Sequence, residues 1–178
     1  MLNLIAPFII KRLLAKQNRK PSLVHGDSIR SIAVIANKES GQYHVTENYV
    51  KQLRHRGIKT VDYYVFFPNQ KIQDLNAAKW KCYPFNPKSL GLFGNFKTPE
   101  LDHYKEVEYD VLIDLSEPDV VECELLVDTI AAKWKAGKGS KSKYRLLDFM
   151  IETKDNDMRS LIHHLDSYLM NFNKMNAA

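Results

Sequence analysis

The stretch Ile29-Arg-Ser-Ile-Ala-Val-Ile-Ala-Asn37 decides the fold of this chain. From Ile32 to Ala36 every residue is apolar. An uninterrupted apolar run of this length is typical of a strand that is buried on both faces of a parallel sheet. The stretch Asp110-Val-Leu-Ile-Asp-Leu115 is the clearest strand signal elsewhere in the chain. Two such strands predict a sheet with helices packed on both of its sides.

The segment after the first strand predicts a helix and then a second strand. Residues 45–57 carry apolar residues at helical spacing, and Gly57 ends the helix. Residues 59–67 form the second β-rich run. A strand, a helix and a strand in this order form a parallel unit whose crossover is right-handed in nearly all known proteins.

The rest of the chain continues the alternation of strands and helices. Further strands are predicted at residues 79–85, 133–138 and 145–151. Further helices are predicted at residues 98–108, from a capping Ser116 to Ala131, and from a capping Asp155 or Asn156 to Phe172. This pattern predicts a three-layer α/β fold with a mostly parallel, open, Rossmann-like sheet in a single domain.

The N-terminal segment differs from the rest in charge. Residues 2–18 predict an amphipathic helix, and the first twenty residues hold five cations and no acid. These cations are Lys11, Arg12, Lys16, Arg19 and Lys20. They equal the formal net charge of +5, so the rest of the chain is close to neutral. The predicted organisation is therefore a basic helix at 1–20, a linker at 21–28, the α/β domain at 29–173 and a tail at 174–178.

The partner of this basic helix stays open. It could pack on its own domain or on a second copy, which predicts a homo-oligomer. It could also dock on a protein partner, on RNA or on a membrane surface. The apolar run at the N-terminus precedes its cations and is too short to cross a bilayer, so we expect neither a secretory signal nor a membrane span. Cys82 and Cys123 lack a zinc-type spacing and are expected to be reduced core thiols, which predicts a cytoplasmic protein.

A ligand of such a sheet is expected at the carboxyl ends of the first strand and of the strand at 110–115. The candidate residues of this edge are Asn37, Lys38, Glu39, Ser40, Gly41, Asp114 and Ser116. Asp114 could act as a base or bind a ribose or a metal, or it could cap a turn or pair with a lysine. Glu39 could act as a base or be a solvated loop charge. The loop at 37–41 is neither a dinucleotide-binding fingerprint nor a P-loop, so no nucleotide cofactor is predicted.

No set of residues for a known catalysis is complete. His163 and His164 are adjacent on a helix and do not share a face, and no third ligand accompanies them, so no metal site is predicted. The second basic run, at residues 133–143, mixes cations with Trp134 and Tyr144. Its candidate partner-binding residues are Lys133, Lys135 and Lys138. Such a run is typical either of nucleic-acid contact or of a solvated loop beside a strand.

Two segments resemble a known enzyme family. The strand Tyr109-Asp-Val-Leu-Ile-Asp-Leu-Ser116 and the later strand Ala131-Ala-Lys-Trp-Lys-Ala-Gly137 are similar to the end of the N-terminal domain of heptosyltransferase-like glycosyltransferases. Over residues 1–172 the chain resembles a family of small uncharacterised proteins of Bacteroidota, known as a domain of unknown function. The resemblance implies a Rossmann-like fold. The glycosyltransferases carry a second, donor-binding domain and a Gly-Asp base, whereas this chain has one domain and Glu39 before Gly41.

The sequence therefore favours a non-catalytic binding or interaction module. The alternative is a small sugar- or nucleotide-acting enzyme, or half of one, that uses residues 37–41 and 114–116.

Overall fold

The computed structural model describes residues 20–22, 24, 26–38, 43–69, 82–91, 95–97, 99–152 and 157–175. The predicted helix at 2–18 and the loop residues Glu39, Ser40 and Gly41 lie outside these ranges. The strands are β1 (Ser31–Asn37), β2 (Thr60–Phe66), β3 (Cys82–Phe85), β4 (Tyr109–Asp114), β5 (Ala132–Lys138) and β6 (Phe149–Ile151). The helices are α2 (Tyr43–His55), α4 (Val121–Thr129) and α5 (Met158–Met175). Short 3₁₀ helices are η1 (Gly26–Ser28), η3 (Pro87–Ser89) and η4 (Pro99–Lys105).

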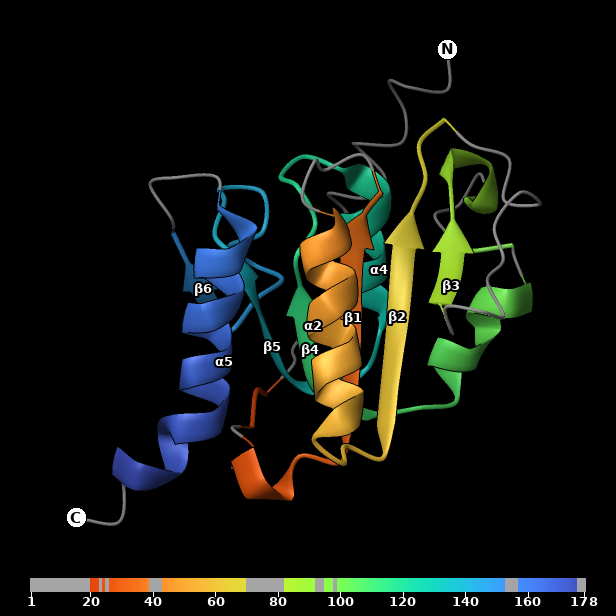
Figure 1. Ribbon diagram of the computed structural model, residues 1–178. Coiled ribbons are helices and arrows are strands. Elements are labelled where there is room, and N and C mark those ends of the chain that lie inside the picture. Colours follow the sequence, from red (N-terminus) through yellow and green to blue (C-terminus); the bar gives the residue numbers. More distant parts are fainter. Residues whose placement is uncertain are drawn as a thin grey trace.

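The six strands form one sheet in the order β3-β2-β1-β4-β5-β6 (Figure 1). Every neighbouring pair in this sheet is parallel. The order reverses between β1 and β4, as in Rossmann folds, because the chain first builds outward from β1 to β3 and then returns to the other side of β1. The predicted α/β fold with a mostly parallel open sheet is confirmed.

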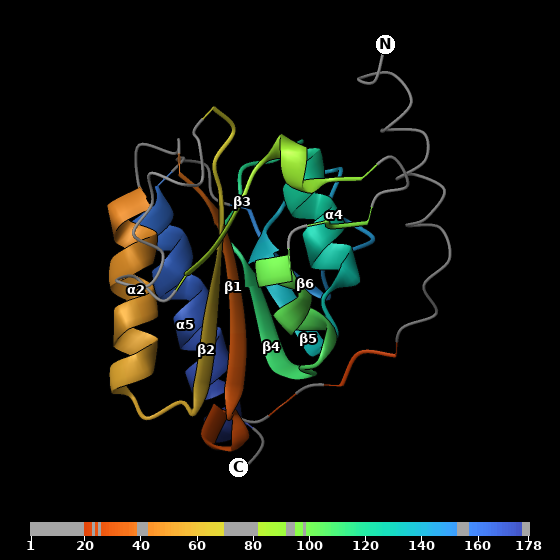
Figure 2. The same ribbon diagram turned by 90° about the vertical axis from the view of Figure 1, so that its right-hand side faces the viewer.

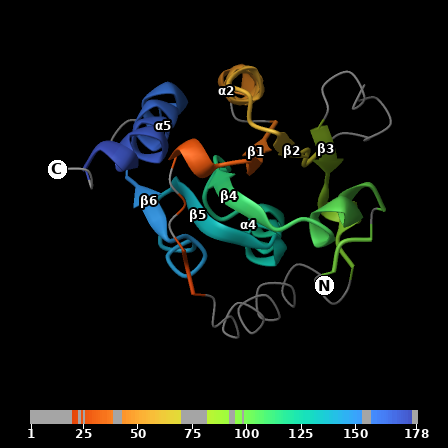
Figure 3. The same ribbon diagram turned by 90° about the horizontal axis from the view of Figure 1, so that it is seen from below.

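Helices cover both faces of the sheet. Figures 2 and 3 show α2 and α5 on one face and α4 on the other. In β1, Ile32 and Val34 pack toward α2 and α5, whereas Ala33 and Ile35 pack toward α4, and all four are fully buried. The uninterrupted apolar run of β1 is thus explained, since each of its faces meets a hydrophobic core.

A chain of polar groups crosses the core on the α4 side. The hydroxyls of Tyr64 and Tyr109 lie 2.9 Å apart, and the Tyr109 hydroxyl donates to Oδ2 of Asp62 at 2.6 Å. The same carboxylate oxygen lies 3.2 Å from Nε2 of His103, on η4. Burial is the main cause that raises the pKa of Tyr109 well above its usual value, and the neighbouring Tyr64 and Asp62 raise it further. The buried hydroxyls therefore stay neutral and hold η4 against the sheet.

Several predicted boundaries need correction. Helix α4 begins at Val121 rather than directly after Ser116, and its N-cap residue Val120 makes no side-chain cap. The strand predicted at 145–151 is reduced to β6, because residues 141–146 form turns. Helix α5 is capped by Asp157, whose carboxylate accepts from the backbone N–H groups of Arg159 and Ser160. The segment predicted as a helix at 98–108 is the 3₁₀ helix η4.

The amino ends of three adjacent strands are joined by Asp110. Its Oδ2 accepts hydrogen bonds from the backbone N–H groups of Arg30 and Ser31 at 2.7 and 3.1 Å. Its Oδ1 accepts from Nζ of Lys133 at 2.7 Å. Burial opposes ionisation of this carboxyl, but the hydrogen bonds from Lys133, Arg30 and Ser31 outweigh it and lower the pKa of Asp110 below its ordinary value of 3.8.

Replacing Asp110 with Asn should therefore destabilise the protein at neutral pH by about 1–3 kcal/mol, since hydrogen bonds to a charged group are lost. The folded-state pKa of Asp110 is depressed, so its contribution is present above the unfolded value and is lost as the pH falls through the folded value. Urea unfolding of the wild type and Asp110→Asn should show a constant gap near neutrality and a shrinking gap below pH 3.8. A gap that is unchanged in acid would contradict this account.

Candidate functional site

The carboxyl edge of the sheet is the first place to look for a ligand, because the helix that follows β1 and the helix that follows β4 cover opposite faces of the sheet (Figure 2). Among the described residues, polar groups of the protein bind one another at this edge. Oδ1 of Asn37, which is buried, accepts a hydrogen bond from the backbone N–H of Glu117 at 2.8 Å. The Glu117 carboxylate in turn accepts from Nζ of Lys138 at 2.9 Å. The strand ends of β1 and β5 are thus tied to the segment that follows β4.

Asp114, at the end of β4, belongs to a fully buried polar cluster. Its Oδ1 accepts from the backbone N–H and the hydroxyl of Ser116 at 2.9 and 2.6 Å. Its Oδ2 lies 2.8 Å from Nζ of Lys143, and both side chains have no exposed surface. The Lys143 ammonium also donates to the carbonyl oxygen and the hydroxyl of Ser116 at 2.6 and 3.0 Å. The Lys143 ammonium therefore donates two hydrogen bonds to Ser116 and faces Oδ2 of Asp114 as an ion pair without hydrogen-bond geometry, which neutralises the charge of Asp114 inside the protein.

Close packing of backbone surrounds this cluster. Gly137 of β5 lies against Asp114, and a Cβ atom at Gly137 would clash with the carbonyl oxygen of Asp114 and lie 3.0 Å from its Cβ. The buried thiol of Cys123, on α4, faces the same cluster. Its pKa is raised chiefly by burial and also by the charge of Asp114. The thiol is thus kept protonated, which disfavours a nucleophilic role.

The basic run at 133–143 is largely engaged within the fold. Lys133 pairs with Asp110, and Lys138 pairs with Glu117. Lys135 is buried, and its ammonium donates to the carbonyl oxygens of Val127 and Asp128 at 2.5 and 3.2 Å, at the end of α4. Of the five cations predicted for the N-terminal basic region, Lys20 is the one that lies among the described residues, and it is exposed.

An open hollow lies beside the crevice, between the end of β1, the start of α2 and the β2–β3 side of the sheet. We call it the edge hollow. Its volume is about 440 Å³, and its lining residues are Lys38, Tyr43, His44, Glu47, Asn48, Lys51, Phe67 and Cys82. The sequence predicted Lys38 at this edge. It did not predict the α2 residues as site residues, because their spacing is that of an ordinary helix.

Lys38 and Glu47 bring charges of opposite sign to the edge hollow. The Lys38 ammonium lies 4.3 Å from the centroid of the Tyr43 ring and 5.8 Å from that of Phe67. Oε2 of Glu47 lies 3.3 Å from Nδ1 of His44. Burial raises the pKa of Tyr43 well above its usual value, and the adjacent Glu47 adds to this effect. The hollow thus combines cationic groups with aromatic surface and a neutral phenol.

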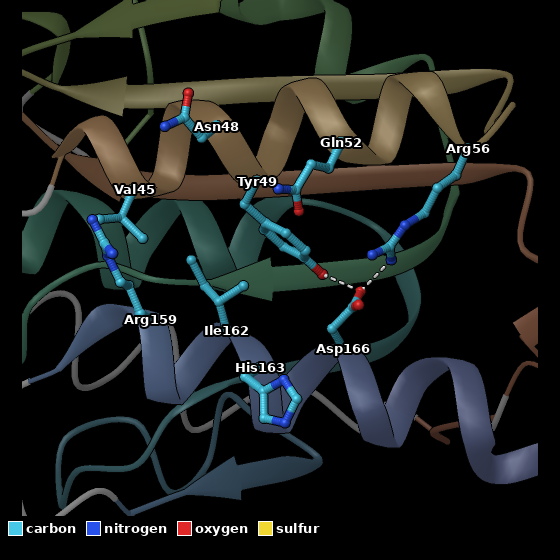
Figure 4. A pocket seen from close by; sticks show the side chains of 9 residues that line it. All are labelled: Val45, Asn48, Tyr49, Gln52, Arg56, Arg159, Ile162, His163 and Asp166. Atoms are coloured by element: carbon cyan, nitrogen blue, oxygen red, sulfur yellow. Dashed lines mark hydrogen bonds and ion pairs between the residues drawn. The ribbon is translucent and has the colours of Figure 1, made fainter.

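A second hollow, of about 470 Å³, lies on the outer side of the molecule between α2 and α5 (Figure 4). We call it the helix groove. Its lining residues are Val45, Asn48, Tyr49, Gln52, Arg56, Arg159, Ile162, His163 and Asp166. Oδ1 of Asp166 accepts from the hydroxyl of Tyr49 at 3.2 Å and from Nη1 of Arg56 at 2.6 Å.

Neither a metal cluster nor a membrane-crossing helix is found in the described part of the chain. No three His, Cys, Asp or Glu side chains there gather closely enough to hold a metal ion. None of the helices there combines the length and the apolar character that a bilayer requires.

Comparison with known proteins gives a family and no function. Residues 4–172 match the model of a family described as "Family of unknown function (DUF6913)". The chain belongs to this family, since the match covers nearly its whole length. No curated protein and no solved structure matches the chain significantly.

The buried cluster predicts that the stability of the protein depends strongly on the pairing of Asp114 with Lys143. Lys143→Met should destabilise the protein by about 3–5 kcal/mol, because the Asp114 carboxylate is then buried without its counter-ion. The double variant Asp114→Asn/Lys143→Met should recover much of this loss, since the buried charge is gone and an acceptor for Ser116 remains. Lys141→Met, an exposed position in the same loop, serves as the control. Urea unfolding tests the series, and a double variant no more stable than Lys143→Met would refute the pairing.

Proposed function

We propose that this member of the family is a non-catalytic binding module that takes a small anion in the edge hollow. The observation that carries the proposal is the position of Lys38. Its ammonium group stands over the rings of Tyr43 and Phe67 at the carboxyl end of β1, where parallel sheets of this topology bind their ligands.

The charge of the edge hollow favours an anion. Lys38 and Lys51 supply two cations, and Glu47, the one carboxylate among the described lining residues, lies against His44. Helix α2 begins at Tyr43, so the positive end of its dipole adds to the same field. A phosphate or carboxylate with a ring that contacts Tyr43 and Phe67 fits this combination of charge and aromatic surface.

The buried cluster supports binding rather than catalysis. A general base must reach the proton that it removes. Asp114 could do so only after Lys143 and Ser116 gave up their contacts with it, and those contacts lie in the closed interior. The alternative, a sugar- or nucleotide-acting enzyme at residues 114–116, would therefore need a large rearrangement of the loop at 139–148.

The likeness to heptosyltransferase-type N-terminal domains makes a sugar phosphate the first anion to test. A cytoplasmic location is part of the same proposal, supported by the two buried free thiols Cys82 and Cys123. Two further parts of the proposal come from the sequence alone. One is an origin in Bacteroidota. The other is that residues 1–20 dock on a protein partner, a second copy, RNA or a membrane surface.

Calorimetric titration with glucose 6-phosphate, AMP and inorganic phosphate tests the anion site. Lys38→Gln should weaken binding of the anion that the wild type prefers by about tenfold or more, since a charge-assisted hydrogen bond contributes roughly 1.5–3 kcal/mol. Added salt should weaken binding to the wild type as well.

Lys59→Gln is the matched control, because Lys59 is an exposed lysine that precedes β2 at the opposite edge of the sheet. It should bind as the wild type does. The proposal fails if none of the three anions binds, or if Lys38→Gln and Lys59→Gln bind equally well.

A further inference from the structure

The helix groove adjoins the edge hollow, since Asn48 lines both, but it has a different character. Its floor is apolar and aromatic, with Val45 and Tyr49 from α2 and Ile162 from α5 (Figure 4). Its α2 rim carries two exposed amides, Asn48 and Gln52. Polar side chains over an apolar floor are typical of surfaces that bind another chain.

The groove has the length of a short extended peptide. Val45 lies near the start of α2 and Arg56 directly after its end, and the eleven steps between them span about 16 Å at the helical rise. An extended chain rises about 3.3 Å per residue, so roughly five residues fit along the groove. Gln52, on the α2 rim, carries an exposed amide that both donates and accepts hydrogen bonds, so it can pair with a peptide backbone.

The charge of the groove selects an acidic chain. Figure 4 shows Arg159 reaching from α5 toward Val45 at one end and Arg56 reaching toward Asp166 at the other. Asp166 is the one carboxylate that lines the groove in the described residues, and Arg56 and Tyr49 already contact it. An arginine has five N–H donors in a planar group, so Arg159 is suited to bind a carboxylate.

We propose that the helix groove binds an extended peptide segment of a partner protein, with an acidic side chain of that segment placed at Arg159. The chain's own N-terminal segment does not complement this groove, because its first twenty residues hold five cations and no acid. The proposal is independent of the anion site, since Lys38 and Lys51 do not line the helix groove.

Selection of phage-displayed random heptapeptides on the full chain tests the proposal. Enriched peptides should carry Asp or Glu and should bind in fluorescence anisotropy with an affinity that falls as salt is raised. Arg159→Gln should weaken their binding by about tenfold or more, as expected for a lost charge-assisted contact. Gln52→Ala should also weaken it, by a smaller factor.

Two controls separate the groove from other surfaces. Arg145→Gln removes an exposed arginine elsewhere, and Lys38→Gln alters only the edge hollow, so both should leave peptide binding unchanged. The proposal is overturned if no peptide is enriched, if enriched peptides lack acidic residues, or if Arg145→Gln weakens binding as much as Arg159→Gln. It is also overturned if light scattering shows a dimer that Arg159→Gln abolishes, because a second copy would then occupy the groove.

Discussion

The buried ion pair of Asp114 and Lys143 is the constraint on which the carboxyl edge of this sheet depends. A charge in the interior is costly unless its partner and its remaining hydrogen bonds are supplied. Here Ser116 hydrogen-bonds to Oδ1 of Asp114 and to the Lys143 ammonium, and Oδ2 of Asp114 is held by the ion pair with Lys143 alone. Three segments far apart in sequence therefore adopt one arrangement together: the end of β4, the residues that follow it and the loop between β5 and β6.

This arrangement decides where a ligand can meet the protein. The crevice between the loops after β1 and β4 is bridged by Asn37 and Glu117, and the carboxylate nearest to it is neutralised. Two hollows of the described residues border α2, one at its start and one along its side toward α5. The sheet thus presents one helix with two different surfaces, one suited to a small anion and one suited to an extended chain.

The sequence was sufficient to predict the sheet, because the apolar runs of β1 and β4 need two covered faces whatever their neighbours are. It was not sufficient for the site. Lys143 stands in a run of lysines, glycines and serines that has the composition of a solvated loop, and only the fold shows that this lysine is fully buried. Serine is a common N-cap residue of helices, yet the hydroxyl of Ser116 donates its hydrogen bond to Asp114. The pairing of Asp114 with a lysine was one of the alternatives that its chemistry left open.

The edge hollow could not be predicted from the sequence for a related reason. Phe67 and Cys82 reach it from strands that are distant in sequence from Lys38 and α2, and only the parallel pairing of β1, β2 and β3 brings them together. The central claim is that ligands meet the protein beside α2 and not at the buried cluster of Asp114, Ser116 and Lys143. The most direct test is a titration with glucose 6-phosphate followed by amide NMR shifts. The account predicts the largest shifts at Lys38, Tyr43 and His44, whereas shifts centred on Ser116, Glu117 and Lys143 would contradict it.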